Sequence, residues 1–142
     1  MNTVLPVLAW ALVELGELEE SHELLARAEA CARGRDDRLT LVDLLWVRAL
    51  LNVRQNHSQR AASILREARA LCRAMPYLYG EVRVLYAYGL LHAQRGERVR
   101  THVCLGAALA LCAQLGERRY AERIVQTLLE LSALPLRQPQ HR

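Results

Sequence analysis

The chain has 142 residues, of which 52% are hydrophobic and 24% charged, and its formal net charge is +4. This length and apolar content are those of one globular domain and exclude an intrinsically disordered protein. Ala, Leu, Arg and Glu dominate between a few glycines and prolines, which is a composition typical of an all-α fold.

Residues 1–15 form the first predicted element. They are apolar, but they lack the basic region that begins a signal peptide, and their pattern continues in phase into the next segment. We therefore interpret them as a helix. No uncharged run in the sequence reaches the roughly 18 to 20 residues that a membrane span needs, so no membrane association is expected.

An offset of 40 positions aligns the segments 2–41, 42–81 and 82–116 without a gap, and each segment is predicted to form two antiparallel helices. The matching columns are Leu5, Leu45 and Leu85; Ala9, Ala49 and Gly89; Gly16, Asn56 and Gly96; Ser21, Ala61 and Thr101; Leu25, Leu65 and Leu105; and Ala28, Ala68 and Ala108. The small residues allow the two helices of a pair to approach closely. The Leu and Ala columns form the apolar stripe that packs in the core.

The column of Gly16, Asn56 and Gly96 predicts where the first helix of each pair ends. Gly and Asn are the residues that enter the left-handed backbone conformation at the lowest cost, and helices often end in that conformation. We therefore expect these three residues to lie in turns.

Residues 117–132 are predicted to form one more amphipathic helix, with Tyr120, Ile124 and Leu128 at helical spacing. A helix here would cap the last apolar face of the array. Residues 133–142 contain Pro135 and Pro139 and are expected to form a flexible tail. The sequence thus predicts a single domain over residues 1–132.

The third segment is similar to the tetratricopeptide repeat: Leu85, Tyr88, Gly89 and His92 follow its first-helix pattern, and Thr101 with Leu105 follows its second. The resemblance implies a right-handed superhelix of three antiparallel helix pairs with a C-terminal capping helix. The period exceeds the usual one of about 34 and falls in the range of HEAT and armadillo arrays, but the turn column and the paired small residues favour the tetratricopeptide class.

The long period also resembles the superhelical regions of maltose-regulator-type ATP-dependent bacterial transcriptional activators and related signalling ATPases. Residues 108–116 and 117–124 carry this resemblance. It implies a role in a regulatory system. The chain has no GxxxxGK[ST] phosphate loop, so only the sensor or scaffold part of such a system is expected.

No pattern in the sequence indicates catalytic chemistry. The histidines His22, His57, His92, His102 and His141 form no HExxH motif, and the cysteines Cys31, Cys72, Cys104 and Cys112 form no CxxC pair. We therefore expect no metal, no cofactor and no enzymatic activity. Cysteines placed among Ala and Leu are interpreted as buried, reduced thiols, which favours a cytoplasmic location.

The tetratricopeptide resemblance implies that the first helix of each pair lines a concave groove. Helical spacing then selects the predicted partner-binding residues, which are Trp10, Asp43, Trp46, Leu50, Arg54, Arg83, Tyr86, Leu90 and Gln94. Such a groove suits a peptide whose acidic group meets an arginine and whose apolar side chains meet the aromatic rings. The alternative is that Trp10 and Trp46 pack against neighbouring helices or a second copy of the chain.

Charge is distributed unevenly: residues 2–41 are net acidic, whereas residues 42–121 are net basic. The favoured function is a scaffold that binds a protein or peptide. The first alternative is a nucleic-acid-associated or transcription-related module, because Arg60, Arg66, Arg69 and Arg73 lie on one predicted helix. The second is homo-oligomerisation, such as a homodimer.

Overall fold

The structure is a computed structural model that describes residue 16 and residues 18–133. Its described part is entirely helical, without a strand, which confirms the all-α prediction. The helices are α2 (Leu18–Gly34), α3 (Arg38–Arg54), α4 (Ser58–Ala74), α5 (Leu78–Gln94), α6 (Arg98–Leu115) and α7 (Arg119–Ala133). The helix predicted over residues 1–15 and the tail beyond residue 133 lie outside the described residues.

The helices recur with a shorter spacing than the sequence period. Helices α2 to α6 begin at residues 18, 38, 58, 78 and 98, so one helix begins every 20 positions. The corners before α2, α3, α4 and α6 have positive φ, which is 82° at Gly16, 51° at Asp36, 60° at Asn56 and 75° at Gly96, and the corner before α7 has 67° at Gly116. The predicted turns at Gly16, Asn56 and Gly96 are thus confirmed.

Backbone hydrogen bonds close four of these corners in the same way. The amides of Asp37, His57, Glu97 and Glu117 each donate to the carbonyl five residues earlier, at 2.8–2.9 Å. This bond satisfies a carbonyl that the end of a helix would otherwise leave without a partner. Pro76 lies in the corner between α4 and α5, where its ring excludes a positive φ.

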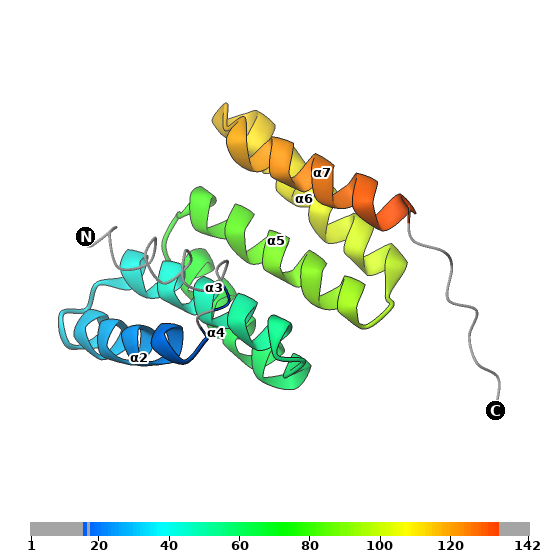
Figure 1. Ribbon diagram of the computed structural model, residues 1–142. Coiled ribbons are helices and arrows are strands. Elements are labelled where there is room, and N and C mark those ends of the chain that lie inside the picture. The colour runs from blue at the N-terminus through cyan, green and yellow to red at the C-terminus, as the bar shows by residue number, and fades with distance from the viewer. Residues whose placement is uncertain (1–15, 17, 134–142) are drawn as a thin grey trace.

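Neighbouring helices pack as antiparallel hairpins, with α3 against α4 and α5 against α6, while α3 also contacts α5 (Figure 1). Helices α2 and α7 lie at opposite ends of the array (Figure 1). The predicted core columns are buried, namely Leu25, Leu65 and Leu105; Ala28, Ala68 and Ala108; and Ser21, Ala61 and Thr101. Leu85 is the exception, since its side chain is only half-buried.

Gly89 is the point of closest approach between α5 and α6. A Cβ atom at this position would lie 2.5 Å from Leu105 Cδ2 and 2.7 Å from Leu105 Cγ. Leu105 is fully buried and has no open space to move into. The small residue that the sequence column predicted is therefore required by this helix contact.

We expect Gly89→Val to lower the free energy of unfolding by about 1–3 kcal/mol, because the added methyl groups overpack the α5–α6 contact. Gly106→Ala is the matched control: Gly106 lies within α6, and a Cβ there would meet nothing within 4 Å. That change should stabilise the protein by about 0.5–1 kcal/mol through helix propensity. Urea unfolding of both variants tests this, and equal stability of Gly89→Val and the wild type would contradict it.

Candidate functional site

An aromatic cluster joins α3, α5 and α7. The Tyr120 ring of α7 lies 6.2 Å from the Trp46 ring and 5.6 Å from the Tyr86 ring, centroid to centroid, and it meets Tyr86 edge-on at 87°. The Tyr86 hydroxyl lies 3.4 Å from Thr127 Oγ1, also on α7. Helix α7 therefore packs on the aromatic residues that the sequence assigned to the groove.

This packing corrects the prediction of an open groove floor. Asp43, Trp46, Leu50 and Tyr86 are only 3–6% exposed. Their side chains are therefore held in the interior, and they do not offer free surface to a peptide. Tyr120 of α7 packs on the Trp46 and Tyr86 rings, and Arg83 and Tyr77 enclose the Asp43 carboxylate.

The remaining predicted groove residues are scattered. Arg54 and Gln94 are exposed, Leu90 is half-buried, and Trp10 lies outside the described residues. Gln94 donates hydrogen bonds to the Val53 carbonyl at 2.6 Å and to Asn56 Oδ1 at 2.9 Å, so it ties the end of α5 to the end of α3. Binding of a partner through these residues stays a prediction.

A buried polar cluster lies beside the aromatic one. The Asp43 carboxylate accepts hydrogen bonds from Arg83 Nη1 at 2.5 Å and from the Tyr77 hydroxyl at 3.0 Å. The Arg83 guanidinium also lies over the Trp46 ring, 5.4 Å from its centroid. Arg83 was predicted to orient an acidic partner, but its charge is already paired within the chain.

Electrostatics in this cluster follow from burial and pairing. Burial raises the pKa of Tyr77, and the Asp43 charge raises it further. Burial by itself would lower the pKa of Arg83, but the charge and the hydrogen bond of Asp43 outweigh it and raise that pKa. Tyr77 therefore stays neutral and Arg83 stays charged at neutral pH. The cluster thus combines a buried ion pair with a neutral tyrosine.

The outer face of α6 differs from the corresponding faces of α2 and α4. Most of its exposed residues are apolar, namely Val99, Val103, Gly106, Ala107, Ala110 and Ala113, and the exposed polar residues Arg100, His102 and Gln114 lie beside or among them. The equivalent exposed residues 40 positions earlier, on α4, are Gln59, Ser63, Arg66, Glu67, Ala70 and Arg73, and those on α2 are Glu19, Glu23, Ala26, Arg27, Ala30 and Arg33. Where α2 and α4 present charged and polar groups to water, α6 presents an apolar stripe.

The exposure of this stripe is large. Val99 is 78% exposed and Val103 is 65% exposed. The columns in which the repeats agree do not contain this signal. It lies in four columns that disagree, in which α6 has Val99, Val103, Ala107 and Ala113 where both α2 and α4 have polar residues.

A pocket of about 230 Å³ lies between α4 and α5, and its lining residues are Arg69, Cys72, Arg73, Glu81, Val84 and Leu85. Burial, with the charges of Glu81 and Asp43, raises the pKa of the Cys72 thiol to about 11. The thiol is therefore protonated at neutral pH and is a poor nucleophile. Of the other cysteines, Cys112 is buried, Cys104 is half-buried and Cys31 is exposed, so the prediction of a buried thiol is wrong for Cys31.

Across residues 18–133, no three His, Cys, Asp or Glu side chains gather in a way that could hold a metal ion. None of the described helices is long and apolar enough to span a membrane. The fold thus defines the chain only as an all-α protein with an exposed apolar helix face. Neither a protein-family model, nor a curated protein, nor a solved structure matches it.

Proposed function

We propose that this protein is a non-enzymatic, cytoplasmic scaffold of the tetratricopeptide type that binds a protein or peptide partner within a regulatory system. The observation that supports the proposal most directly is the apolar outer face of α6. Exposed apolar residues that gather on one helix face are typical of an interaction surface, and on α6 they include Val99 and Val103 on the side away from its buried residues. A partner would cover the other side.

The side chains of this face suit a helical partner. Gly106, Ala107 and Ala110 lie in the middle of the stripe, where small residues allow another backbone to approach closely. Val99 and Val103 provide bulkier apolar groups at its N-terminal end. An amphipathic helix that lays its apolar side along a shallow apolar face is a common mode of peptide recognition.

A second copy of the chain is the second candidate for the partner. The stripe carries its valines in its N-terminal half, its alanines in its C-terminal half and Gly106 between them. In an antiparallel pair of α6 helices related by a two-fold axis, the valines of each copy would face the alanines of the other. Such an interface is self-complementary.

Val99→Glu tests the proposed face. We expect this variant to retain less than about a tenth of any partner that the wild type retains from the cells that produce it, because docking would bury an unpaired carboxylate. The matched control is Gln59→Glu, which introduces the same residue at the equivalent exposed position of α4. Immobilised protein and quantitative mass spectrometry provide the measurement.

Light scattering on the purified proteins distinguishes a homodimer from a foreign partner. Circular dichroism of both variants should match the wild type, since an acidic residue in the first turn of a helix is favourable. If Val99→Glu retains its partners as fully as Gln59→Glu does, and the oligomeric state is also unchanged, the outer face of α6 is not the interface.

A further inference from the structure

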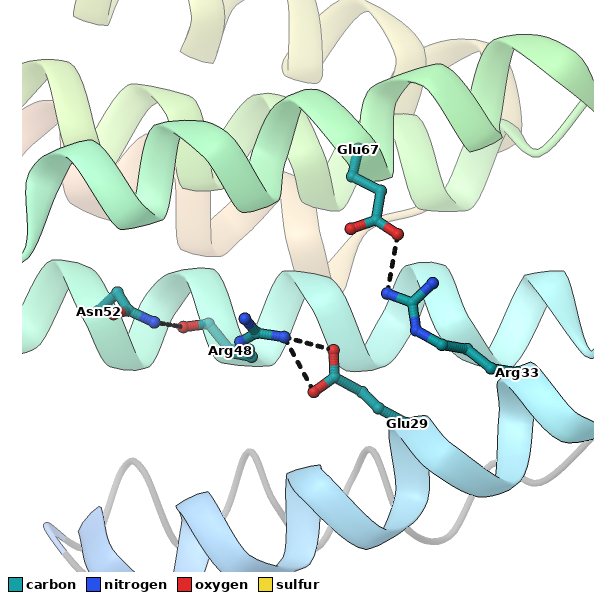
Figure 2. Close-up of polar contacts among 5 residues, drawn as sticks. All are labelled: Glu29, Arg33, Arg48, Asn52 and Glu67. Carbon is teal, nitrogen blue, oxygen red and sulfur yellow. Dashed lines mark hydrogen bonds and ion pairs between the residues drawn. The ribbon is translucent and has the colours of Figure 1, made fainter.

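Two ion pairs close the junction at which α2 meets α3 and α4. Arg33 on α2 donates to Glu67 on α4 at 2.8 Å, and Arg48 on α3 donates to Glu29 on α2 at 2.7 Å (Figure 2). The Glu29 side chain is only 10% exposed. We call this set of contacts the first junction. Here Arg33 and Arg48 each have a carboxylate partner.

The second junction is formed by α4, α5 and α6. These helices begin 40 residues after α2, α3 and α4, respectively, and are equivalent to them. Moving each residue by 40 replaces Arg33 with Arg73, Glu67 with Ala107, Glu29 with Arg69, and Arg48 with Tyr88. Both carboxylates are lost and the number of arginines is kept. The second junction therefore has two guanidinium groups in positions where the first has two complete ion pairs.

The arginines of the second junction keep their charge unneutralised. Arg66, Arg69 and Arg73 are exposed on one side of α4, and none of them forms an ion pair within residues 18–133. All three act on Tyr88: burial raises the pKa of its hydroxyl, and the three positive charges oppose that rise. All three charges therefore lie near Tyr88 of α5.

The pocket between α4 and α5 lies beside these charges. Arg69 and Arg73, one helical turn apart, line it together with Leu85 and the almost fully buried Val84 and Cys72, whose thiol is protonated. Glu81 also lines the pocket, but it makes no ion pair with either arginine in the described chain. A ligand that supplies both a carboxylate and an apolar group matches this lining.

The geometry points to the second junction as a binding site for an acidic segment of the protein partner. Carboxylates of that segment pair with Arg69 and Arg73, taking the place that Glu67 holds against Arg33 at the first junction. A neighbouring apolar side chain enters the pocket against Val84 and Leu85. This inference rests on the proposed scaffold function, because the segment belongs to the partner that covers α6.

The lining favours an acidic peptide over a nucleic acid. A phosphodiester backbone offers charge without an apolar group beside it, so the half-buried Leu85 side chain in the pocket would stay uncovered. The adjoining outer face of α6 is apolar as well, with Val103 and Ala107 exposed. Nucleic-acid surfaces pair basic residues with a hydrated phosphate backbone and are strongly polar.

The test uses two rhodamine-labelled, 17-residue helical peptides of Ala and Leu, one with Glu and one with Gln at the same polar positions. Fluorescence anisotropy measures their binding to the full chain. We expect the Glu peptide to bind at least about tenfold more tightly than the Gln peptide. Arg69→Gln and Arg73→Gln should each weaken the Glu peptide about three- to fivefold, as for an exposed ion pair. Arg60→Gln, on the same helix but off this row, should leave binding unchanged.

Three results would overturn the inference: equal binding of the two peptides, binding of neither, or Arg69→Gln and Arg73→Gln variants that bind like the wild type. A labelled 17-nucleotide single strand is the third probe. If it binds more tightly than the Glu peptide, with a steep dependence on salt, the site is one for nucleic acid. The Val99→Glu experiment tests the scaffold function separately. If partner retention depends on Val99 but the protein shows no preference for the acidic peptide, the scaffold function stands and the acidic-segment site does not.

Discussion

Trp46→Ala is expected to lower the free energy of unfolding by about 3–5 kcal/mol, the usual cost of removing a large buried aromatic side chain. The Trp46 side chain is 6% exposed in the middle of α3. It contacts the Tyr120 ring and lies under the Arg83 guanidinium. Its loss would open a cavity between α3, α5 and α7 and remove both contacts.

Urea unfolding followed by circular dichroism measures this effect. Tyr79→Ala is the control, because Tyr79 is an aromatic residue on α5 whose side chain is about half exposed, and its removal should change stability by less than about 0.5 kcal/mol. If Trp46→Ala is as stable as the wild type and only loses its partner, Trp46 belongs to an open groove after all.

Asp43→Ala is expected to cost a similar amount, about 3–5 kcal/mol, since it breaks a buried ion pair and leaves one charge without its partner. Asp43 is 5% exposed. The substitution removes the acceptor for both Arg83 and Tyr77. The Arg83 guanidinium would then remain two-thirds enclosed with no carboxylate beside it.

Glu67→Ala provides the comparison for Asp43→Ala. It removes the partner of Arg33, but both side chains of that pair are more than 40% exposed, so the loss should be below about 1 kcal/mol. The triple variant Asp43→Leu, Tyr77→Phe, Arg83→Met removes every polar member of the cluster and should recover most of the stability. Equal losses for Asp43→Ala and Glu67→Ala would show that the Asp43 pair contributes no more than a surface pair.

Local rules account for the part of the fold that was predicted correctly. Gly16, Asn56 and Gly96 lie at corners with positive φ because only a few residue types accept that conformation cheaply. Leu25, Leu65 and Leu105 are buried because a helical stripe of apolar residues has to face a neighbouring helix. Both rules involve residues within a few turns of one another, and a sequence displays them directly.

The candidate site depended on contacts that no local rule contains. Asp43 and Arg83, which the sequence places on a groove, lie 40 positions apart along the chain and meet as a buried pair. The apolar outer face of α6 could have been read from the sequence, but only by asking which equivalent positions disagree. The sequence shows the arginines of α4 as a possible phosphate-binding row. Only the ion pairs of the first junction reveal that the equivalent carboxylates are lost at the second.

The amino-acid sequence by itself determined the helical class, the corners and the columns that form the core, because each depends on backbone preference or on periodicity along one helix. The tertiary structure decided which faces remain open to water. Helix α7 places Tyr120 on Trp46 and Tyr86, and this buries the two aromatic rings that the sequence had marked for binding. The coverage of one helix by another depends on how distant segments pack, and no spacing within a single helix reports it.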